Sequence, residues 1–170
     1  MSNELQNGGS MKKTDWIKII LVVSLLGNVA LFKNQERDNR RQELKYELLN
    51  SAIYRDLGQL ETTIQYQVDN NWENEALVTQ KLDDAIDSVI LNHAMEGDDN
   101  KEDLLWSLYE YLNEFKYGDE ISGVSLNDNQ RADYIYLGER LRSSGWMYNV
   151  GYDRNWNNFA SKIEDLVTES

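Results

Sequence analysis

The chain has 170 residues, with 30 acidic and 17 basic side chains, one histidine, and neither cysteine nor proline. The lack of cysteine excludes disulfide bridges, thiolate metal sites and cysteine nucleophiles. The lack of proline, in a chain rich in leucine, glutamate, aspartate and lysine, predicts an all-α protein. Five tryptophans and ten tyrosines distinguish it from a disordered acidic tail.

Most of the acidic charge follows residue 32. The segment Lys33–Ser170 carries 28 acidic and 14 basic side chains, a net charge of −14. Nucleic acid is therefore not an expected partner, because phosphate binding requires a basic surface. The acidic surface favours either solubility alone or docking of a basic partner.

Residues 1–15 are predicted to form a flexible polar tail, and residues 16–32 a single transmembrane anchor. The part Ile19–Phe32 contains no charge. The seventeen residues from Trp16 span roughly 25 Å as a helix, at the lower limit for a hydrocarbon core of about 30 Å. Trp16 suits the membrane interface, and Lys18 can extend its ammonium group to the headgroups.

Three alternatives compete with an anchor: a buried core helix, an amphipathic interfacial helix and a cleaved signal peptide. An interfacial helix needs a polar face, and Ile19–Leu26 is apolar on all sides except at Ser24. A cleavage site needs small residues, and Asn28 occupies the position two residues before the best candidate, Ala30. We therefore expect an uncleaved anchor.

The orientation of the anchor is ambiguous, because basic residues flank it on both sides. The start Met11-Lys12-Lys13 resembles a bacterial export signal, and a long domain can be exported regardless of flanking charge. The positive-inside rule would instead keep the following basic residues in the cytoplasm. These residues are also candidates for contact with anionic lipid headgroups, the alternative being a solvated helix start; they are Lys33, Arg37, Arg40, Arg41 and Lys45.

Residues 33–68 are predicted to form a juxtamembrane stalk helix that continues into a bundle. Its apolar side chains recur at spacings of three and four, typical of one helical face; they are Leu49, Ile53, Leu57, Leu60, Ile64 and Val68. Gly58 interrupts this face and either weakens the helix or permits a close crossing. A short coiled-coil dimer is possible, although a core-facing helix is the commoner arrangement.

Residues 69–170 are predicted to form the remaining helices, giving an up-and-down bundle of about five helices. Asn71 is the expected N-cap of the second helix and Asp153 that of the last. Ser125 and Asp128 resemble a capping box for the fourth helix. Leucine stripes mark the buried faces, as in Leu105, Leu108 and Leu112.

No catalytic residue, metal site or cofactor is predicted, and an enzyme is not expected. His93 is the only histidine, and a lone histidine near a helix end is more often a cap or a half-buried ring than a ligand. The acidic run 98–103 alternates like a calcium loop, but its sixth position is Asp103 instead of glycine. An acidic first turn favoured by the helix dipole explains it better.

The aromatic segment Trp146–Trp156 is the best candidate for a partner contact. Its composition is typical of interface hot spots; the candidate residues are Trp146, Tyr148, Tyr152, Arg154 and Trp156. The alternative is that these rings cover one end of the bundle. We therefore predict a single-pass protein of a bacterial cell membrane whose exported bundle binds an unidentified protein or forms a homo-oligomer. A ligand-binding sensor ectodomain and a cytoplasm-facing adaptor are the alternatives.

Overall fold

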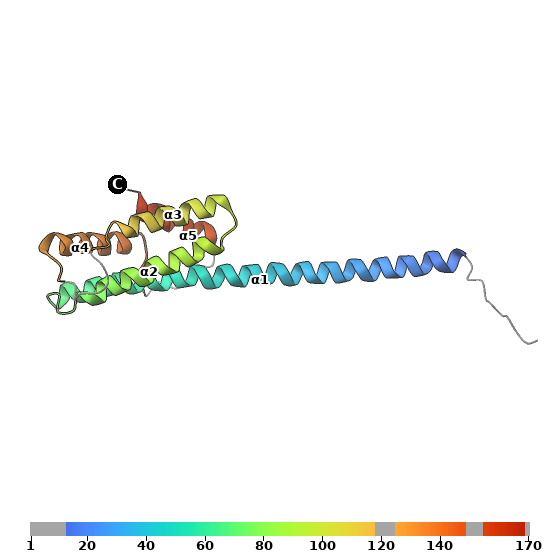
Figure 1. Cartoon of the computed structure of the whole chain (residues 1–170), viewed down its shortest axis with the longest axis horizontal. Coiled ribbons are helices and arrows are strands. Elements are labelled where there is room, and N and C mark those ends of the chain that lie inside the picture. Colours follow the sequence, from blue (N-terminus) through green and yellow to red (C-terminus); the bar gives the residue numbers. More distant parts are fainter. Residues whose placement is uncertain (1–12, 118–124, 149–154, 169–170) are drawn as a thin grey trace, which may run out of the picture. The chain divides into compact units, whose positions relative to one another are not determined.

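The computed structural model describes residues 13–117, 125–148 and 155–168, and these form five helices (Figure 1). Their bounds are α1 (Lys13–Asp69), α2 (Ala76–Met95), α3 (Asp99–Asn113), α4 (Asp128–Ser143) and α5 (Trp156–Val167). The described residues contain no strand. The predicted all-α class and the helical bundle are thus confirmed.

The chain divides into two compact units, residues 1–44 and residues 45–170. The first unit contains the N-terminal part of α1, and the second contains the remainder of α1 together with α2 to α5. The predicted anchor and stalk therefore belong to one continuous helix. The hydrophobic core lies in the second unit, which we call the bundle.

The core of the bundle follows the apolar stripes in the sequence. On α1, Ile53, Leu57 and Leu60 are fully buried, whereas Val68 at the end of the stripe is half-exposed. The other helices contribute similar stripes; these include Leu82, Ala85 and Val89 of α2, Leu105, Leu108 and Leu112 of α3, Leu137 and Leu141 of α4, and Phe159, Ile163 and Leu166 of α5. The predicted stripes of α1 and α3 therefore coincide with buried faces, apart from Val68.

The helix starts differ from their predicted caps. The capping box of α4 is formed by Asn127 and Gln130, whose side chains each accept the other's backbone N–H, and not by Ser125 and Asp128. Asn155, and not Asp153, caps α5. In both cases a neighbouring Asn is the N-cap, because its side-chain oxygen can accept a hydrogen bond from a backbone N–H of the first helical turn.

The turn between α1 and α2 is longer than predicted. Asn71 and Trp72 both adopt left-handed backbone conformations, with φ of 53° and 60°, and α2 begins only at Ala76. Such a conformation is costly for tryptophan and persists only where surrounding contacts hold it. Here the fully buried side chain of Gln67 accepts a hydrogen bond from the backbone N–H of Asn74 at 2.9 Å. The backbone carbonyl of Gln67 accepts another from the backbone N–H of Trp72 at 2.8 Å.

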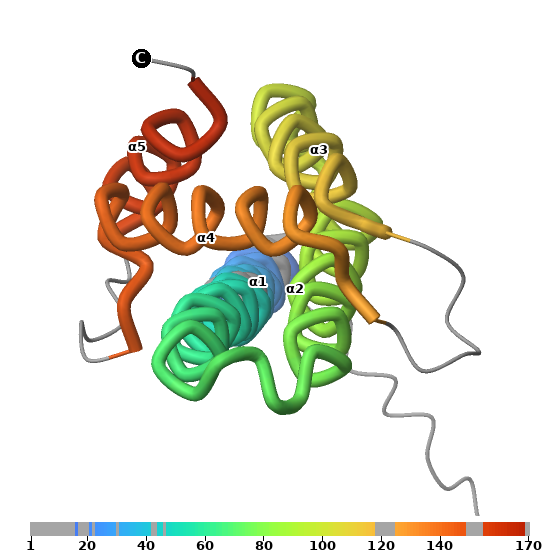
Figure 2. Tube along the Cα trace, turned by 90° about the vertical axis from the view of Figure 1, so that its left-hand side faces the viewer, coloured from blue at the N-terminus to red at the C-terminus, as the bar shows by residue number. Residues whose placement is uncertain are grey.

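Helices α2 and α3 run antiparallel, while α4 passes obliquely over α1 (Figure 2). The ion pair between Lys116 and Asp83, 3.1 Å apart, joins the end of α3 to the first half of α2. Where α4 meets α1, Gly138 faces Ile64, and a Cβ at position 138 would lie 2.9 Å from Ile64 Cγ2. The close crossing of α4 over α1 thus depends on Gly138, whereas Gly58 allows the backbone of Tyr148 to approach α1.

One buried polar pair joins α1 to α2. The Asn92 amide donates a hydrogen bond to Asn50 Oδ1 at 2.9 Å, and both side chains are buried. At the same end of the two helices, Lys45 Nζ donates to the carbonyl of Met95 at 2.5 Å. The C-terminus of α2 is therefore fixed to α1 by a cation at its last carbonyls, where the helix dipole favours positive charge.

Candidate functional site

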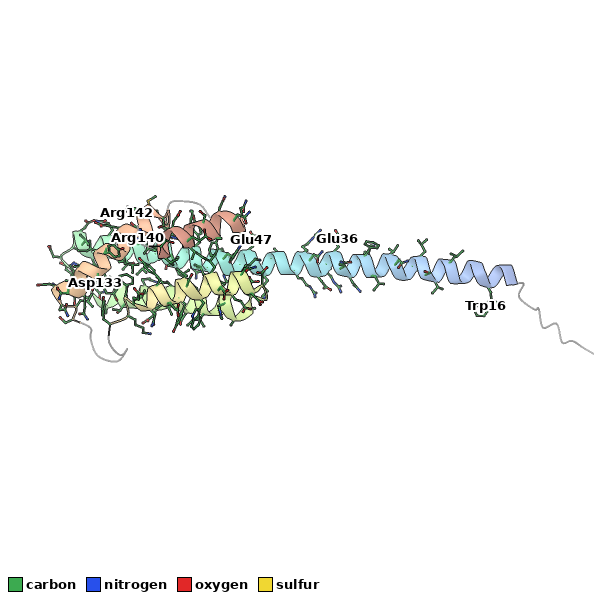
Figure 3. The ribbon with its side chains drawn as sticks, turned by 90° about the horizontal axis from the view of Figure 1, so that it is seen from above. Trp16, Glu36, Glu47, Asp133, Arg140 and Arg142 are labelled. Atoms are coloured by element: carbon green, nitrogen blue, oxygen red, sulfur yellow. The ribbon has the colours of Figure 1, made fainter. Side chains whose placement is uncertain are left out.

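The N-terminal part of α1 exposes a band of large apolar side chains. Trp16 marks its beginning, and Glu36 lies just after its end (Figure 3). The exposed residues are Leu21, Val23, Leu25, Leu26, Val29, Leu31 and Phe32, and the most exposed of them, Phe32, has 74% of its surface accessible. At 100° per residue these positions surround the helix.

This band falls short of the predicted transmembrane anchor in one respect. Among the helical residues that the structure describes, no stretch is both long and apolar enough to cross a membrane. The side chains at positions 17–20, 22 and 30 lie outside the described set. The structure therefore gives no support to the predicted span.

The predicted membrane-surface residues are divided between the two units. Lys33, Arg37, Arg40 and Arg41 are exposed on the N-terminal part of α1. Arg40 lies 3.6 Å from Glu36, one helical turn away, and such exposed pairs contribute little to stability. Lys45 differs, because it belongs to the bundle and binds the end of α2.

Trp146, the first residue of the predicted contact segment, lies in the core. Its side chain is fully buried, with ring centroids 4.9 Å from Tyr54 and 5.6 Å from Phe159. The indole N–H donates to the backbone carbonyl of Lys162 at 3.3 Å. Trp146 therefore packs within the bundle, as the alternative to a partner contact predicted.

The rest of the segment is divided between surface and core. Tyr148 is 64% exposed, whereas Trp156 is partly buried against Phe159. A Cβ at Gly58 would lie 3.2 Å from the backbone of Tyr148, so the connector rests directly on α1. Tyr152 and Arg154 lie outside the described residues. The structure thus does not bring all five candidates together on one surface.

Lys162 of α5 joins the connector to α1. Its ammonium group contacts the Tyr54 hydroxyl, donates to the carbonyl of Gly145 at 3.0 Å, and lies 4.6 Å from the centre of the Tyr54 ring. Gly145 has φ of +81°, a conformation that glycine adopts without strain. This cation is surrounded by bundle groups, and its arrangement is structural.

Arg140 and Arg142 of α4, labelled in Figure 3, form hydrogen bonds with α5 and α1. Arg142 donates to Glu61 Oε1 at 2.6 Å and to Gln65 Oε1 at 2.7 Å, and the Glu61 side chain is only 8% exposed. Arg140 Nη2 donates to the carbonyls of Asp165, Leu166 and Thr168 at 2.6–2.8 Å. Positive charge at a helix C-terminus is favourable, so Arg140 fixes the end of α5.

Sequence reasoning missed an exposed aromatic group on α2 and α3. The Trp106 ring lies 5.5 Å from His93 and 4.8 Å from Tyr109, and 46% of its surface is accessible. Trp106 falls between the buried Leu105 and Leu108 in sequence, on the other side of the helix. A large aromatic outside the leucine stripe was the available signal.

Two shallow grooves on the bundle are open to solvent. One lies between α1 and α2, and its lining includes Arg55, Asp56, Lys81 and Asp84. In this groove Arg55 pairs with Asp56 at 2.8 Å, and Lys81 with Asp84 at 2.7 Å. The other, between α3 and α5, includes Lys101 and Trp156 in its lining. Their open shape suits a polypeptide better than a small ligand, which is usually enclosed.

The acidic run at 98–103 serves as a helix start. Asp98 is the N-cap of α3, and its carboxylate accepts the backbone N–H of Asn100 at 3.1 Å. Asp99 and Glu102 lie in the first turn, where the helix dipole favours negative charge. No group of three metal-binding side chains occurs among the described residues.

Burial raises the pKa of three tyrosines of the bundle. Loss of solvent raises the pKa of Tyr134, whose side chain is fully buried, and that of Tyr111. Burial, together with the hydrogen bond from the hydroxyl to Asp133 at 2.6 Å, raises the pKa of Tyr117 to about 12. Because these pKa values exceed the ordinary value of about 10, the folded state holds the protons more tightly than the unfolded chain.

Stability should therefore fall at alkaline pH. The contribution of these tyrosines is complete below pH about 10 and is lost as the pH rises toward 12, since only the unfolded chain ionises in that interval. We expect Tyr117→Phe to reduce this alkaline loss, measured by urea unfolding across the interval. Tyr66→Phe, at an exposed tyrosine, is the matched control. Equal slopes in both variants would contradict the assignment.

The described residues thus present an exposed apolar band, a basic cluster, two open grooves and one exposed aromatic group. No group of three metal-binding side chains occurs among them, and the grooves and exposed side chains are candidate binding surfaces. Comparison of the chain with protein-family models, curated proteins and solved structures gives no match.

Proposed function

We propose that the chain is a single-pass membrane protein, anchored by residues 16–32, whose bundle binds a protein partner outside the cytoplasm. The observation that carries the proposal is the exposed apolar band on α1. A helix that is apolar on all sides requires apolar surroundings, and Leu21, Leu26 and Phe32 are more than half exposed. A lipid bilayer would supply such surroundings along the whole segment.

The residues that flank the band favour a bilayer over a second protein. A coiled-coil partner would need apolar side chains at only two of every seven positions, whereas residues 21–32 are apolar at every position except Ser24, Gly27 and Asn28. Trp16 precedes the band and suits the headgroup region. Lys33, Arg37, Arg40 and Arg41 follow it, and their exposed cations could bind anionic headgroups.

A protein partner is favoured over a small ligand by the surface of the bundle. Its grooves are open and lined by charged side chains such as Arg55 and Asp84. Met147 and Tyr148 are exposed on the connector beside α1. Large aromatic and methionine side chains of this kind are enriched in protein interfaces.

The anchor can be tested by charge substitution in the full chain expressed in bacteria. We expect the wild-type protein to remain in the membrane pellet after alkaline carbonate extraction. The double variant Leu25→Asp and Leu26→Asp should appear in the soluble fraction, because an aspartate at the centre of a span costs about 2.5–3.5 kcal/mol. Immunoblotting of the two fractions measures the distribution.

A matched control places the same charges elsewhere on α1. Leu44 and Leu48 are also exposed, and Leu44→Asp with Leu48→Asp should leave the protein in the pellet. Release of the wild-type protein by carbonate would refute the anchor and favour an interfacial helix. Protease digestion of a C-terminal tag in spheroplasts then tests the orientation. Digestion supports the exported bundle, whereas protection until lysis establishes the cytoplasm-facing adaptor.

A further inference from the structure

The aromatic group on α2 and α3 is a cluster of three rings, His93, Trp106 and Tyr109. The Trp106 ring lies beside His93 and Tyr109, at centroid distances of 5.5 and 4.8 Å and with ring planes tilted by 50° and 35°. Tyr109 is itself packed against the core, so it holds the indole in place. Across the seam on α2, Ile90 is also exposed. The surface of Trp106 is therefore ordered before any partner binds.

Carboxylates surround this surface. Glu102 lies one helical turn before Trp106 and Glu110 one turn after it, so both lie on the same face of α3. Asp103, three residues before Trp106, borders the same face and is exposed. None of these three carboxylates forms an ion pair with a cation in the part of the chain that the structure describes.

An aromatic face bordered by carboxylates selects a cationic ligand. The indole face attracts an ammonium or guanidinium group through its quadrupole, most strongly for tryptophan. The carboxylates Glu102 and Glu110 add charge complementarity, and an excess of 14 acidic side chains over residues 33–170 attracts a cation from a distance. A purely apolar partner would have to desolvate these carboxylates, which is unfavourable.

We propose that Trp106, with Glu102 and Glu110, is a docking site for an arginine- or lysine-rich segment of a partner protein. One cationic side chain stacks on the indole, and its neighbours pair with the two carboxylates. Arginine is the better fit, because its planar guanidinium both stacks on a ring and forms bidentate bonds with a carboxylate. This inference is independent of the membrane anchor and of the aromatic connector.

The test uses the full chain in zwitterionic detergent and fluorescein-labelled hexa-arginine as the probe, with binding measured by fluorescence anisotropy. We expect Trp106→Leu to raise the Kd about 3- to 10-fold, the range expected for the loss of one cation–π contact. Glu102→Gln with Glu110→Gln should weaken binding further and reduce its dependence on salt.

Matched controls separate this site from the general acidity of the bundle. Glu139→Gln with Glu164→Gln removes the same charge from exposed positions of α4 and α5, and Tyr66→Leu removes an exposed ring from α1; both should leave the Kd within twofold. Equal loss of binding in the charge control, or unchanged binding in Trp106→Leu, would overturn the proposal.

A second measurement follows binding on the wild-type chain and needs a variant only to assign one resonance. Fluorine NMR of the wild-type chain carrying 5-fluorotryptophan gives one resonance for each of the five tryptophans, and Trp106→Leu identifies that of Trp106 by its disappearance. We expect hexa-arginine to shift the Trp106 resonance more than the resonance of the buried Trp146. A shift at other tryptophans with none at Trp106 would place the binding elsewhere and refute the site.

Discussion

Replacing Trp146 by alanine should lower the free energy of unfolding of the bundle by about 3–5 kcal/mol. The side chain is fully buried between Tyr54 and Phe159, so the substitution removes a large apolar volume that neighbouring side chains cannot refill. It also removes the hydrogen bond to the carbonyl of Lys162. Urea denaturation of the full chain in detergent, followed by far-ultraviolet circular dichroism, measures the change.

Tyr148→Ala is the matched control for Trp146. Tyr148 is two residues away but 64% exposed, so its removal should change the free energy of unfolding by about 0.5 kcal/mol or less. Trp146→Phe should fall between the two, because it keeps the ring contacts and loses the indole N–H. Equal stability of Trp146→Ala and wild type would mean that Trp146 is available to a partner.

Substitution of Arg142 by methionine should cost about 2–3 kcal/mol of stability, somewhat below the 3–5 kcal/mol typical of a fully buried pair. The Glu61 carboxylate is 8% exposed, and Arg142 supplies its two strongest hydrogen bonds, at 2.6 and 2.9 Å. The variant leaves that carboxylate buried without its cation. The estimate is reduced because the arginine side chain itself is 44% exposed.

The double variant Arg142→Met with Glu61→Gln tests the cause. Removing the charge at position 61 as well should recover part of the loss, since a neutral amide is cheaper to bury than an unpaired carboxylate. The same urea denaturation compares the single and double variants. If the two are equally unstable, packing of the arginine stem, and not its charge, accounts for the loss.

Apolar periodicity predicted much of this fold, because burial of a helical face depends on residues three and four apart. Leu57, Leu60 and Ile64 of α1 illustrate this, and all are buried. Helix ends were less predictable, since several neighbouring polar side chains can supply the same backbone bond. The choice of Asn127 over Ser125 as the cap of α4 is one example.

Contacts between distant residues could not be predicted from local pattern. Glu61 and Arg142 are 81 residues apart, and the sequence around either residue does not indicate that the other is its partner. The aromatic composition of residues 146–156 suggested a surface, but composition does not reveal that Trp146 faces Tyr54 across the bundle. The exposure of Trp106 was not predicted either, because it depends on how α2 and α3 pack.

The buried pair of Asn50 and Asn92 resolves an ambiguity in how α1 and α2 can align. The α1 stripe almost repeats after seven residues, so sliding the helix by that distance would bring Leu60 to the place of Ile53 and Ile64 to that of Leu57. Apolar contact alone would discriminate poorly between the two alignments. In the shifted alignment the side-chain amides of Asn50 and Asn92 would be separated and left buried without partners. Each unpaired polar group would cost about 1–3 kcal/mol of stability, so this single hydrogen bond selects the native alignment.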